Sequence, residues 1–254
     1  MLRSLIVSAA VFAAAGAQGA AFSPITFSTS ADYTSNFTAN SHFTYDSTNQ
    51  LMRFGVASGS SAGTSELSYT PSSNFLTETL SYDTSFSVYG GTLSSGIFTR
   101  VQSDHTGVLG LVNVVSGTTT TNQLQLRLFY GADSAGNGVG TQLYNSSTIT
   151  LPRSVAAGSA MHVTLTETGG ANQLFNLTVS DGTGTLATSG NVALAGTGSS
   201  AYTGAGGIAL RASSSATNGL SMTFDNLAAT ATPEPAALAM LGLGGLALLR
   251  RRRA

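Results

Sequence analysis

Apolar and polar residues alternate along many short stretches of the chain. The alternation is clearest at Leu124-Leu126-Leu128-Tyr130, Met161-Val163-Leu165 and Phe175-Leu177-Val179, and it recurs at Met52-Phe54-Val56, Leu80-Tyr82-Phe86-Val88 and Leu220-Met222-Phe224. A period of two puts every second side chain on one face of a strand, so each stretch predicts a strand with one buried face. Roughly twelve strands and no helix are expected before Ala236, which predicts an all-β sandwich or barrel.

Residues 22–230 are long enough to form one domain that buries about 70% of its unfolded surface. Glycine-rich turns at 169–172 and 181–184 separate predicted strands, because glycine adopts positive φ at little cost. The chain has no cysteine, so the domain has neither a disulfide bond nor a thiolate metal site. Packing alone must hold it together.

Charged residues are sparse and mostly acidic. Residues 22–230 contain ten acidic residues, no lysine and five arginines, giving a net charge near −5; the arginines are Arg53, Arg100, Arg127, Arg153 and Arg211. A protein that binds nucleic acid needs a row of basic residues to replace the counterions of the phosphates. The composition therefore excludes nucleic acid as a partner.

The order of the predicted elements resembles the concanavalin A-like or laminin G-like jelly roll. The resemblance depends on an early segment at 31–37, a late hairpin at 161–165 and 175–181, a glycine-led strand at 206–211 and a Phe-Asp-Asn strand at 222–227. In that family the last strand closes the sandwich by pairing the end of the domain with its beginning. The resemblance implies a jelly-roll β-sandwich over residues 22–230 and adds little about function.

Residues 1–21 have the pattern of a cleavable secretory signal. Arg3 lies in a short basic start, residues 5–15 are largely apolar, and the small residues that suit a cleavage site lie between Ala17 and Ala21. An uncleaved N-terminal anchor is the alternative. In both cases the following domain is expected to be exported.

Residues 231–254 form a separate C-terminal region. Pro233 and Pro235 flank Glu234 and stop any upstream helix, since each proline removes a backbone donor and fixes φ. Residues 236–249 are all Ala, Leu, Met or Gly, and a helix of that length spans about 21 Å, short of a bilayer core of about 30 Å. Local thinning of the bilayer and snorkelling arginine stems compensate for this difference.

Four arginines end this region: Arg250, Arg251, Arg252 and Arg253. Basic flanks resist translocation, so they are expected on the cytoplasmic side. The region thus predicts a single short transmembrane helix at 236–249 with the β-rich domain on the outside.

The order of these elements resembles the PEP-CTERM sorting signal of Gram-negative bacteria. The matching features are Pro233-Glu234-Pro235, the Gly-containing apolar segment at 241–246 and the arginine cluster at 250–253. The resemblance implies recognition by an exosortase, removal of the tail, and export to the cell surface or an exopolysaccharide matrix. The implied partners are the exosortase, the inner membrane as a transient anchor, and extracellular polysaccharide.

No predicted strand carries the paired carboxylates of a glycosidase. Retaining enzymes need two carboxyl groups about 5 to 5.5 Å apart, which acids alternating on one strand would supply. The acids here are scattered singly, and the closest pair in the strand region, Glu78 and Asp83, is expected to point to opposite faces. No Gly-x-Ser-x-Gly elbow lies on a predicted strand-to-helix turn, so no serine nucleophile is expected. No catalytic residue is therefore assigned, and the protein is not expected to be an enzyme.

Candidate ligand-binding residues are few. His42, His105 and His162 are the only histidines and lack the spacing of metal ligands, and alternation puts His162 on the outer face of its strand. The loop at 133–138 has side-chain oxygens at alternating spacing, which makes calcium a weak candidate, because a single acid binds it poorly. No cofactor is otherwise expected. Asp225 and Asn226 are expected to serve as hydrogen-bonding residues of the closing strand.

Aromatic residues fall into two predicted groups. Tyr82, Phe86, Phe98 and Phe175 fit core positions, whereas Tyr33, Tyr89, Tyr144 and Tyr202 lie near predicted turns and are candidates for exposed contacts with sugars. The chain has no tryptophan, which excludes a flat tryptophan platform for crystalline polysaccharide.

Two functional classes remain. The first is an exported, exosortase-sorted surface or matrix protein whose non-catalytic sandwich adheres to polysaccharide or builds the layer. The alternative is a carbohydrate-active enzyme, either a glycoside hydrolase or a lyase, on the same fold. Two carboxylates within about 6 Å of each other in the concave groove of the sandwich would favour the enzyme, whereas a groove lined by Ser, Thr and Tyr would favour binding or structure.

Overall fold

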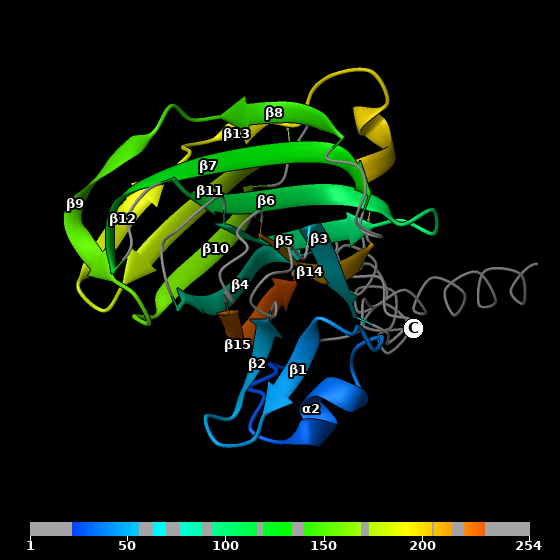
Figure 1. Cartoon of the computed structure of the whole chain (residues 1–254). Helices are drawn as coiled ribbons and strands as arrows, with labels where there is room; N and C mark the ends of the chain where they lie inside the picture. Colours follow the sequence, from blue (N-terminus) through cyan, green and yellow to red (C-terminus); the bar gives the residue numbers. More distant parts are fainter. Residues whose placement is uncertain are drawn as a thin grey trace, which may run out of the picture.

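The fold consists of two antiparallel β-sheets packed face to face (Figure 1). The computed structural model describes residues 22–55, 63–69, 77–87, 93–115, 119–133, 140–168, 173–204, 206–214 and 221–231. The eight-stranded sheet runs in the order β1 (Phe43–Asp46), β2 (Leu51–Gly55), β15 (Ser221–Ala231), β4 (Thr77–Phe86), β10 (Met161–Thr168), β11 (Leu174–Asp181) and β12 (Gly184–Thr188), and β13 (Val192–Ala193) also pairs with β11.

The seven-stranded sheet packs against it. Its order is β3 (Gly63–Ser68), β14 (Gly207–Ser214), β5 (Leu93–Val101), β6 (Thr106–Val114), β7 (Thr120–Asp133) and β8 (Thr141–Asn145), and β9 (Ile149–Ala156) also pairs with β7. Strands that neighbour one another in each sheet come from distant parts of the chain. The all-β sandwich predicted from the alternation is confirmed.

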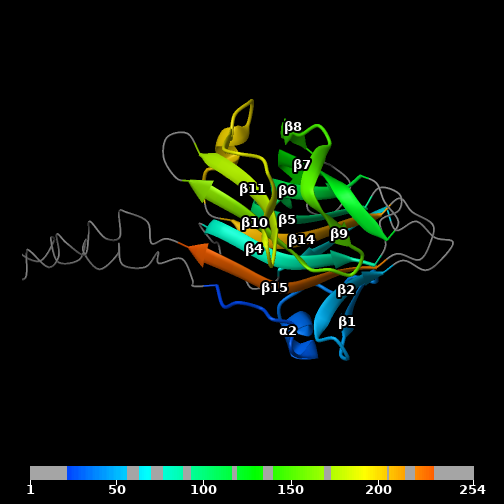
Figure 2. The ribbon, with the colours of Figure 1, turned by 90° about the vertical axis from the view of Figure 1, so that its left-hand side faces the viewer.

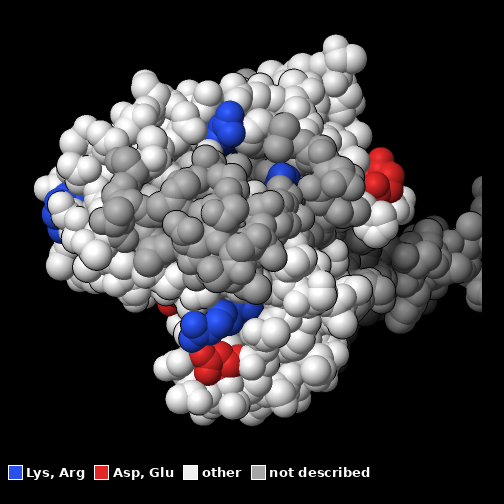
Figure 3. All heavy atoms as spheres, in the orientation of Figure 1, with Lys and Arg blue, Asp and Glu red and all other residues white. Residues whose placement is uncertain are grey.

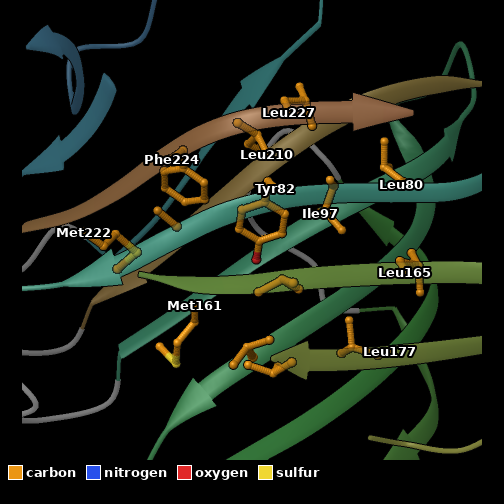
Figure 4. Close-up of a cluster of buried hydrophobic side chains, with 14 of the residues drawn as sticks. Leu80, Tyr82, Ile97, Met161, Leu165, Leu177, Leu210, Met222, Phe224 and Leu227 are labelled. Carbon is orange, nitrogen blue, oxygen red and sulfur yellow. The ribbon is translucent and has the colours of Figure 1, made fainter. Parts of the chain in front are cut away.

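The main core lies between the sheets and follows the predicted period of two. In β10, Met161, Val163 and Leu165 are buried, whereas His162 is exposed. Figure 4 shows inward side chains of β4, β10 and β15 meeting those of the opposite sheet, among them Leu80, Tyr82, Leu165, Phe224, Ile97 and Leu210. Burying a large apolar side chain contributes about 1.5–3 kcal/mol, so this layer supplies most of the stability of a domain without disulfides.

The two ends of the domain lie side by side. The Ile25 N–H donates to the Leu227 carbonyl at 2.8 Å, and the Leu227 N–H donates back at 2.9 Å. Figure 2 shows the first described residues running beside β15. The closure of beginning against end that the jelly-roll resemblance implied is therefore present.

Two short helices depart from the prediction of strands alone. Helix α2 (Ser30–Thr34) occupies most of the early segment at 31–37, and its first turn is capped because the Thr29 N–H donates to the Asp32 carboxylate at 3.1 Å. A 3-10 helix, η2 (Ser199–Tyr202), lies between β13 and β14. The described residues also contain more strands than predicted, because β8, β12 and β13 are short edge strands without clear alternation.

A buried ion pair joins the sheets at the end of the sandwich where β5 and β10 finish. Arg100 has a φ of 58° at a bulge in the β5–β14 ladder, which turns its side chain inward. Its Nε donates to Glu167 Oε2 at 3.0 Å, and its Nη2 contacts Glu167 Oε1. Its Nη1 donates to the Tyr202 carbonyl at 2.6 Å. The charges of both partners are therefore compensated inside the core.

Candidate functional site

The outer surface of the eight-stranded sheet is polar. Because the inward positions are apolar, the alternating outward positions carry hydroxyl, amide and charged groups. We call this surface the polar face; it comprises Arg53, Thr79, Ser81, Asp83, Ser85, His162, Thr164, Thr166, Asn176, Thr178, Ser180, Thr188, Thr223, Asp225, Asn226 and Thr230. All of these residues are partly or fully exposed.

Hydroxyl groups align across the polar face in two rows. The first row pairs the hydroxyls of Ser81, Thr164, Thr178 and Thr188 from strand to strand, and the second pairs those of Thr230, Thr79 and Thr166 and ends at the Asn176 amide. Adjacent strands lie about 4.8 Å apart, so each of these hydroxyl rows extends about 14 Å. Each hydroxyl can both donate and accept a hydrogen bond, so the rows present groups that match those of sugars.

A row of ionisable side chains crosses the same face beside the hydroxyl rows. Asp225, Asp83 and His162 occupy paired positions on β15, β4 and β10. His162 Nδ1 lies 2.7 Å from Asp83 Oδ1, and the Asn226 amide donates to Asp83 Oδ2 at 2.8 Å. Asn226 has a φ of 49° and lies in a bulge between β15 and β4. The bulge therefore places the Asn226 side chain against Asp83.

Burial raises the pKa of the Asp225 carboxyl above its usual value, and the negative charge of Asp83 acts in the same direction. The Asn226 N–H opposes this by donating to Asp225 Oδ1 at 2.8 Å. The hydrogen-bonding roles predicted for Asp225 and Asn226 are thus confirmed. The prediction that the acids are scattered singly is wrong for Asp83 and Asp225, because strand register sets them opposite each other.

Two of the arginines form partly exposed ion pairs. Arg53 lies 2.5 Å from Asp46, and hydrogen bonds from Asn49 and then Arg53 hold the pKa of Asp46 well below its usual range. Arg153 likewise pairs with Asp181, whose pKa is lowered chiefly by that contact. Neither arginine is left available to bind an anion.

The remaining arginines do not form a basic surface either. Arg100 and Arg211 are buried, with 1% and 5% of their surface exposed. The Nε of Arg127 donates to Asn145 Oδ1 at 3.2 Å, and the guanidinium group of Arg127 lies over the ring of Phe129. Figure 3 shows few charged atoms on the face in view. Among the described residues, positive charge is therefore either paired, buried or isolated.

The outer surface of the seven-stranded sheet differs from the polar face. Phe98, Leu109, Leu111, Phe129, Ala132 and Ala209 form a second apolar cluster there, and each is at most 4% exposed. Phe98 is buried as predicted, but in this cluster and not in the main core. Since these side chains are shielded from water, we place the candidate site on the polar face.

The three histidines lie on different elements. His42 precedes β1, His105 lies in the turn between β5 and β6, and His162 lies on β10 with its side chain outward, as predicted. Across the described ranges, no group of three or more His, Cys, Asp or Glu side chains could hold a metal ion. Most of the loop at 133–138, the weak calcium candidate, lies outside those ranges.

The tyrosines predicted at turns do not form an exposed set. Tyr202 is only 8% exposed, because its hydroxyl lies 2.8 Å from Thr106 Oγ1 and its ring lies beside Tyr130. Tyr33 and Tyr144 are half-buried and pack against the core. Tyr89 lies outside the described residues. The prediction of exposure is therefore wrong for Tyr202.

Both predicted targeting segments lie outside the described residues. The first is the signal at 1–21. The second is the C-terminal signal, with its motif at 233–235, its apolar run at 236–249 and its arginines at 250–253. Within the part of the chain that is described, no helix combines the length and the apolar character needed to cross a bilayer.

Solved structures place the domain in a fold class. A legume lectin-like domain from Entamoeba histolytica superposes with a TM-score of 0.55 at 7% identity, covering 85% of this chain and 100% of that one. Bacillus licheniformis β-glucanase superposes with a TM-score of 0.46 at 12% identity, covering 85% of this chain and 91% of that one. The alginate lyase Aly36B superposes with a TM-score of 0.43 at 13% identity, covering 86% of this chain and 94% of that one. The domain is a lectin-like, concanavalin A-like jelly-roll sandwich, and at these identities the similarity concerns fold alone.

The C-terminal region matches a known sorting motif. Residues 231–253 match the PEP-CTERM protein-sorting motif, which includes Pro233, Glu234, Pro235 and the four arginines. The chain therefore carries a PEP-CTERM sorting signal directly after its β-sandwich, and this signal implies processing by an exosortase, export and membrane anchoring. No curated protein sequence matches the chain.

Proposed function

We propose that the protein is a non-catalytic surface or matrix protein that, once sorted, associates with extracellular polysaccharide through its polar face. The two hydroxyl rows carry this proposal. They place hydrogen-bonding groups at regular intervals on an accessible sheet, and such groups can exchange hydrogen bonds with sugar hydroxyls.

The distribution of charge favours a neutral polysaccharide. An acidic polymer requires cations along its path, and the described arginines are paired, buried or isolated. The net charge near −5 of residues 22–230 would in addition repel a polyanion. The proposal therefore names neutral glycans as the ligand class.

Binding measurements with matched variants test this function. We expect the chain comprising residues 22–231 to bind immobilised neutral polysaccharide and to ignore acidic polysaccharide. Thr164→Val together with Thr178→Val removes two hydroxyls from one row while keeping the β-branched shape, and each lost hydrogen bond is worth about 0.5–1.5 kcal/mol. Affinity should fall roughly tenfold, since about 1.4 kcal/mol corresponds to a factor of ten.

The control changes the same residue type on the other sheet. Thr141→Val with Thr150→Val alters two exposed strand positions in β8 and β9 and should leave binding unchanged. Absence of binding to every polysaccharide tested, or equal loss in both double variants, would refute the role of the polar face.

A carbohydrate-active enzyme is the second candidate function. The observation that favours it is the pairing of Asp83 with Asp225, because residues directly opposite in an antiparallel ladder have Cβ atoms about 4.5–5.5 Å apart. The raised pKa of Asp225 beside a second carboxylate also suits a general acid. Release of reducing sugar that disappears in both Asp83→Asn and Asp225→Asn would establish this candidate and overturn the non-catalytic proposal.

A further inference from the structure

The last strand of the sandwich ends directly before the sorting motif. β15 stays paired with β4 to its end, where Thr230 lies opposite Thr79 and, after a shift in register, Ala231 lies opposite Thr77. Leu227 is held in addition by its two backbone hydrogen bonds with Ile25. Only Thr232 separates Ala231 from Pro233. The motif is therefore joined to a paired strand without a linker.

The short connection fixes which end of the sandwich meets the membrane. Four residues lie between Ala231 and Ala236, the start of the apolar run, and the five Cα–Cα steps span at most about 18 Å. The headgroup layer is about 5–8 Å thick on each side of the bilayer. When the apolar run is inserted, the end of β15 must lie close to the membrane surface. Figure 2 shows that β15 ends at one edge of the sandwich.

We name this edge the sorting end and define it by residues 22–25, 77–79 and 228–231. We propose that the sorting end faces the membrane while the chain is processed, and that residues 229–231 must leave the sheet before the motif is processed. The proposal rests on the sorting of the chain proposed above.

The reason is that the backbone of β15 cannot pair with β4 and bind an enzyme at the same time. An enzyme that cuts a chain contacts extended backbone on both sides of the bond, and the backbone groups of β15 are already engaged with β4 up to Ala231. The last residues of a strand open locally at lower free energy than its centre. Opening of β15 from its end would therefore provide the free backbone and would limit the rate of processing.

A reversible clamp at the sorting end tests this. The chain has no cysteine, so Thr79→Cys with Thr230→Cys introduces one unambiguous pair at directly opposed positions on the outer face. The control pair, Ser85→Cys with Thr223→Cys, joins the same two strands farther from the motif. Processing of the full chain is followed in exosortase-containing cells by mass spectrometry of both termini, and disulfide formation is read from the same spectra.

We expect the clamp at 79 and 230 to slow processing at least about tenfold, because it blocks the opening of the strand end. The control clamp should leave the rate unchanged, and a reductant should restore processing of the clamped chain. Equal rates in both clamped chains, whether fast or slow, would overturn the proposal.

A second variant needs no disulfide. Six Gly and Ser residues inserted after Ala231 supply free backbone without opening of the sheet and should accelerate processing. An unchanged rate in this variant would also overturn the proposal. If the native chain is not processed at all, the proposed sorting itself fails, and this outcome is distinct from the two above.

Discussion

Replacing Glu167 with Gln should destabilise the sandwich strongly. The side chains of Arg100 and Glu167 are 1% and 7% exposed, so the variant leaves the guanidinium charge of Arg100 buried without its carboxylate. Removing one partner of a buried ion pair costs about 3–5 kcal/mol, because the remaining charge has lost its hydration as well as its partner. For a domain of this size, about 1 kcal/mol lowers Tm by about 2–4 °C, so a decrease of roughly 6–20 °C is expected.

Thermal and urea unfolding of residues 22–231, followed by circular dichroism, measures this effect. Arg53→Gln is the control, since it breaks the partly exposed pair with Asp46, leaves the hydrogen bonds from Thr48 and Asn49 to Asp46 in place, and should change Tm little. The double variant Arg100→Met with Glu167→Leu removes both charges and should regain most of the lost stability. If Glu167→Gln unfolds within about 2 °C of the native chain, the buried pair does not hold the sheets together as argued.

Three further changes probe other parts of the fold. Asp225→Asn should raise Tm at pH 7, because the raised pKa of Asp225 means that its ionised form is disfavoured in the folded state. This gain in Tm should vanish at about pH 3, where the carboxyl group is protonated in both the folded and the unfolded state. A gain in Tm that does not depend on pH would contradict the argument. Tyr82→Phe should lower the free energy of unfolding in urea by about 1–2 kcal/mol, since the Tyr82 hydroxyl lies 2.9 Å from Ser95 Oγ in the opposite sheet. An unchanged free energy of unfolding would show that this hydrogen bond does not contribute to stability. Gly96→Ala should cost about 1–3 kcal/mol in urea unfolding because its Cβ would lie 2.8 Å from the Gly110 carbonyl oxygen, whereas Gly182→Ala, whose Cβ meets nothing within 4 Å, should be tolerated.

Local periodicity allowed the sequence to predict much of the fold. In Met161-Val163-Leu165 and Phe175-Leu177-Val179, the residue type alone indicates which side chains face the core, because a strand alternates its faces whatever it pairs with. The hairpin between β11 and β12 at 181–184 could be predicted from its glycines for the same local reason. Where alternation was absent, as in α2 and η2, the prediction failed.

The candidate site depends on which strands become neighbours. Thr164 and Thr178 form a row with Ser81 only because β10 lies between β4 and β11, and the register of those ladders is set by packing of the whole core. Asp83 and Asp225 are separated by most of the chain, so no spacing in the sequence could reveal that they are paired. The sequence signal for the hydroxyl rows was the run of hydroxyl residues at alternate positions of β10, namely Thr164, Thr166 and Thr168.

The sequence by itself determined that this protein is β-rich, free of disulfides, poor in positive charge, and supplied with a C-terminal sorting signal, because each of these properties belongs to residue types or to a short contiguous pattern. Only the tertiary structure decided that Arg100 turns inward to Glu167, that Tyr202 is buried, and that two aspartates oppose each other on the polar face. Bulges and long-range register produce these arrangements, and both arise from the packing of strands that are distant in the chain.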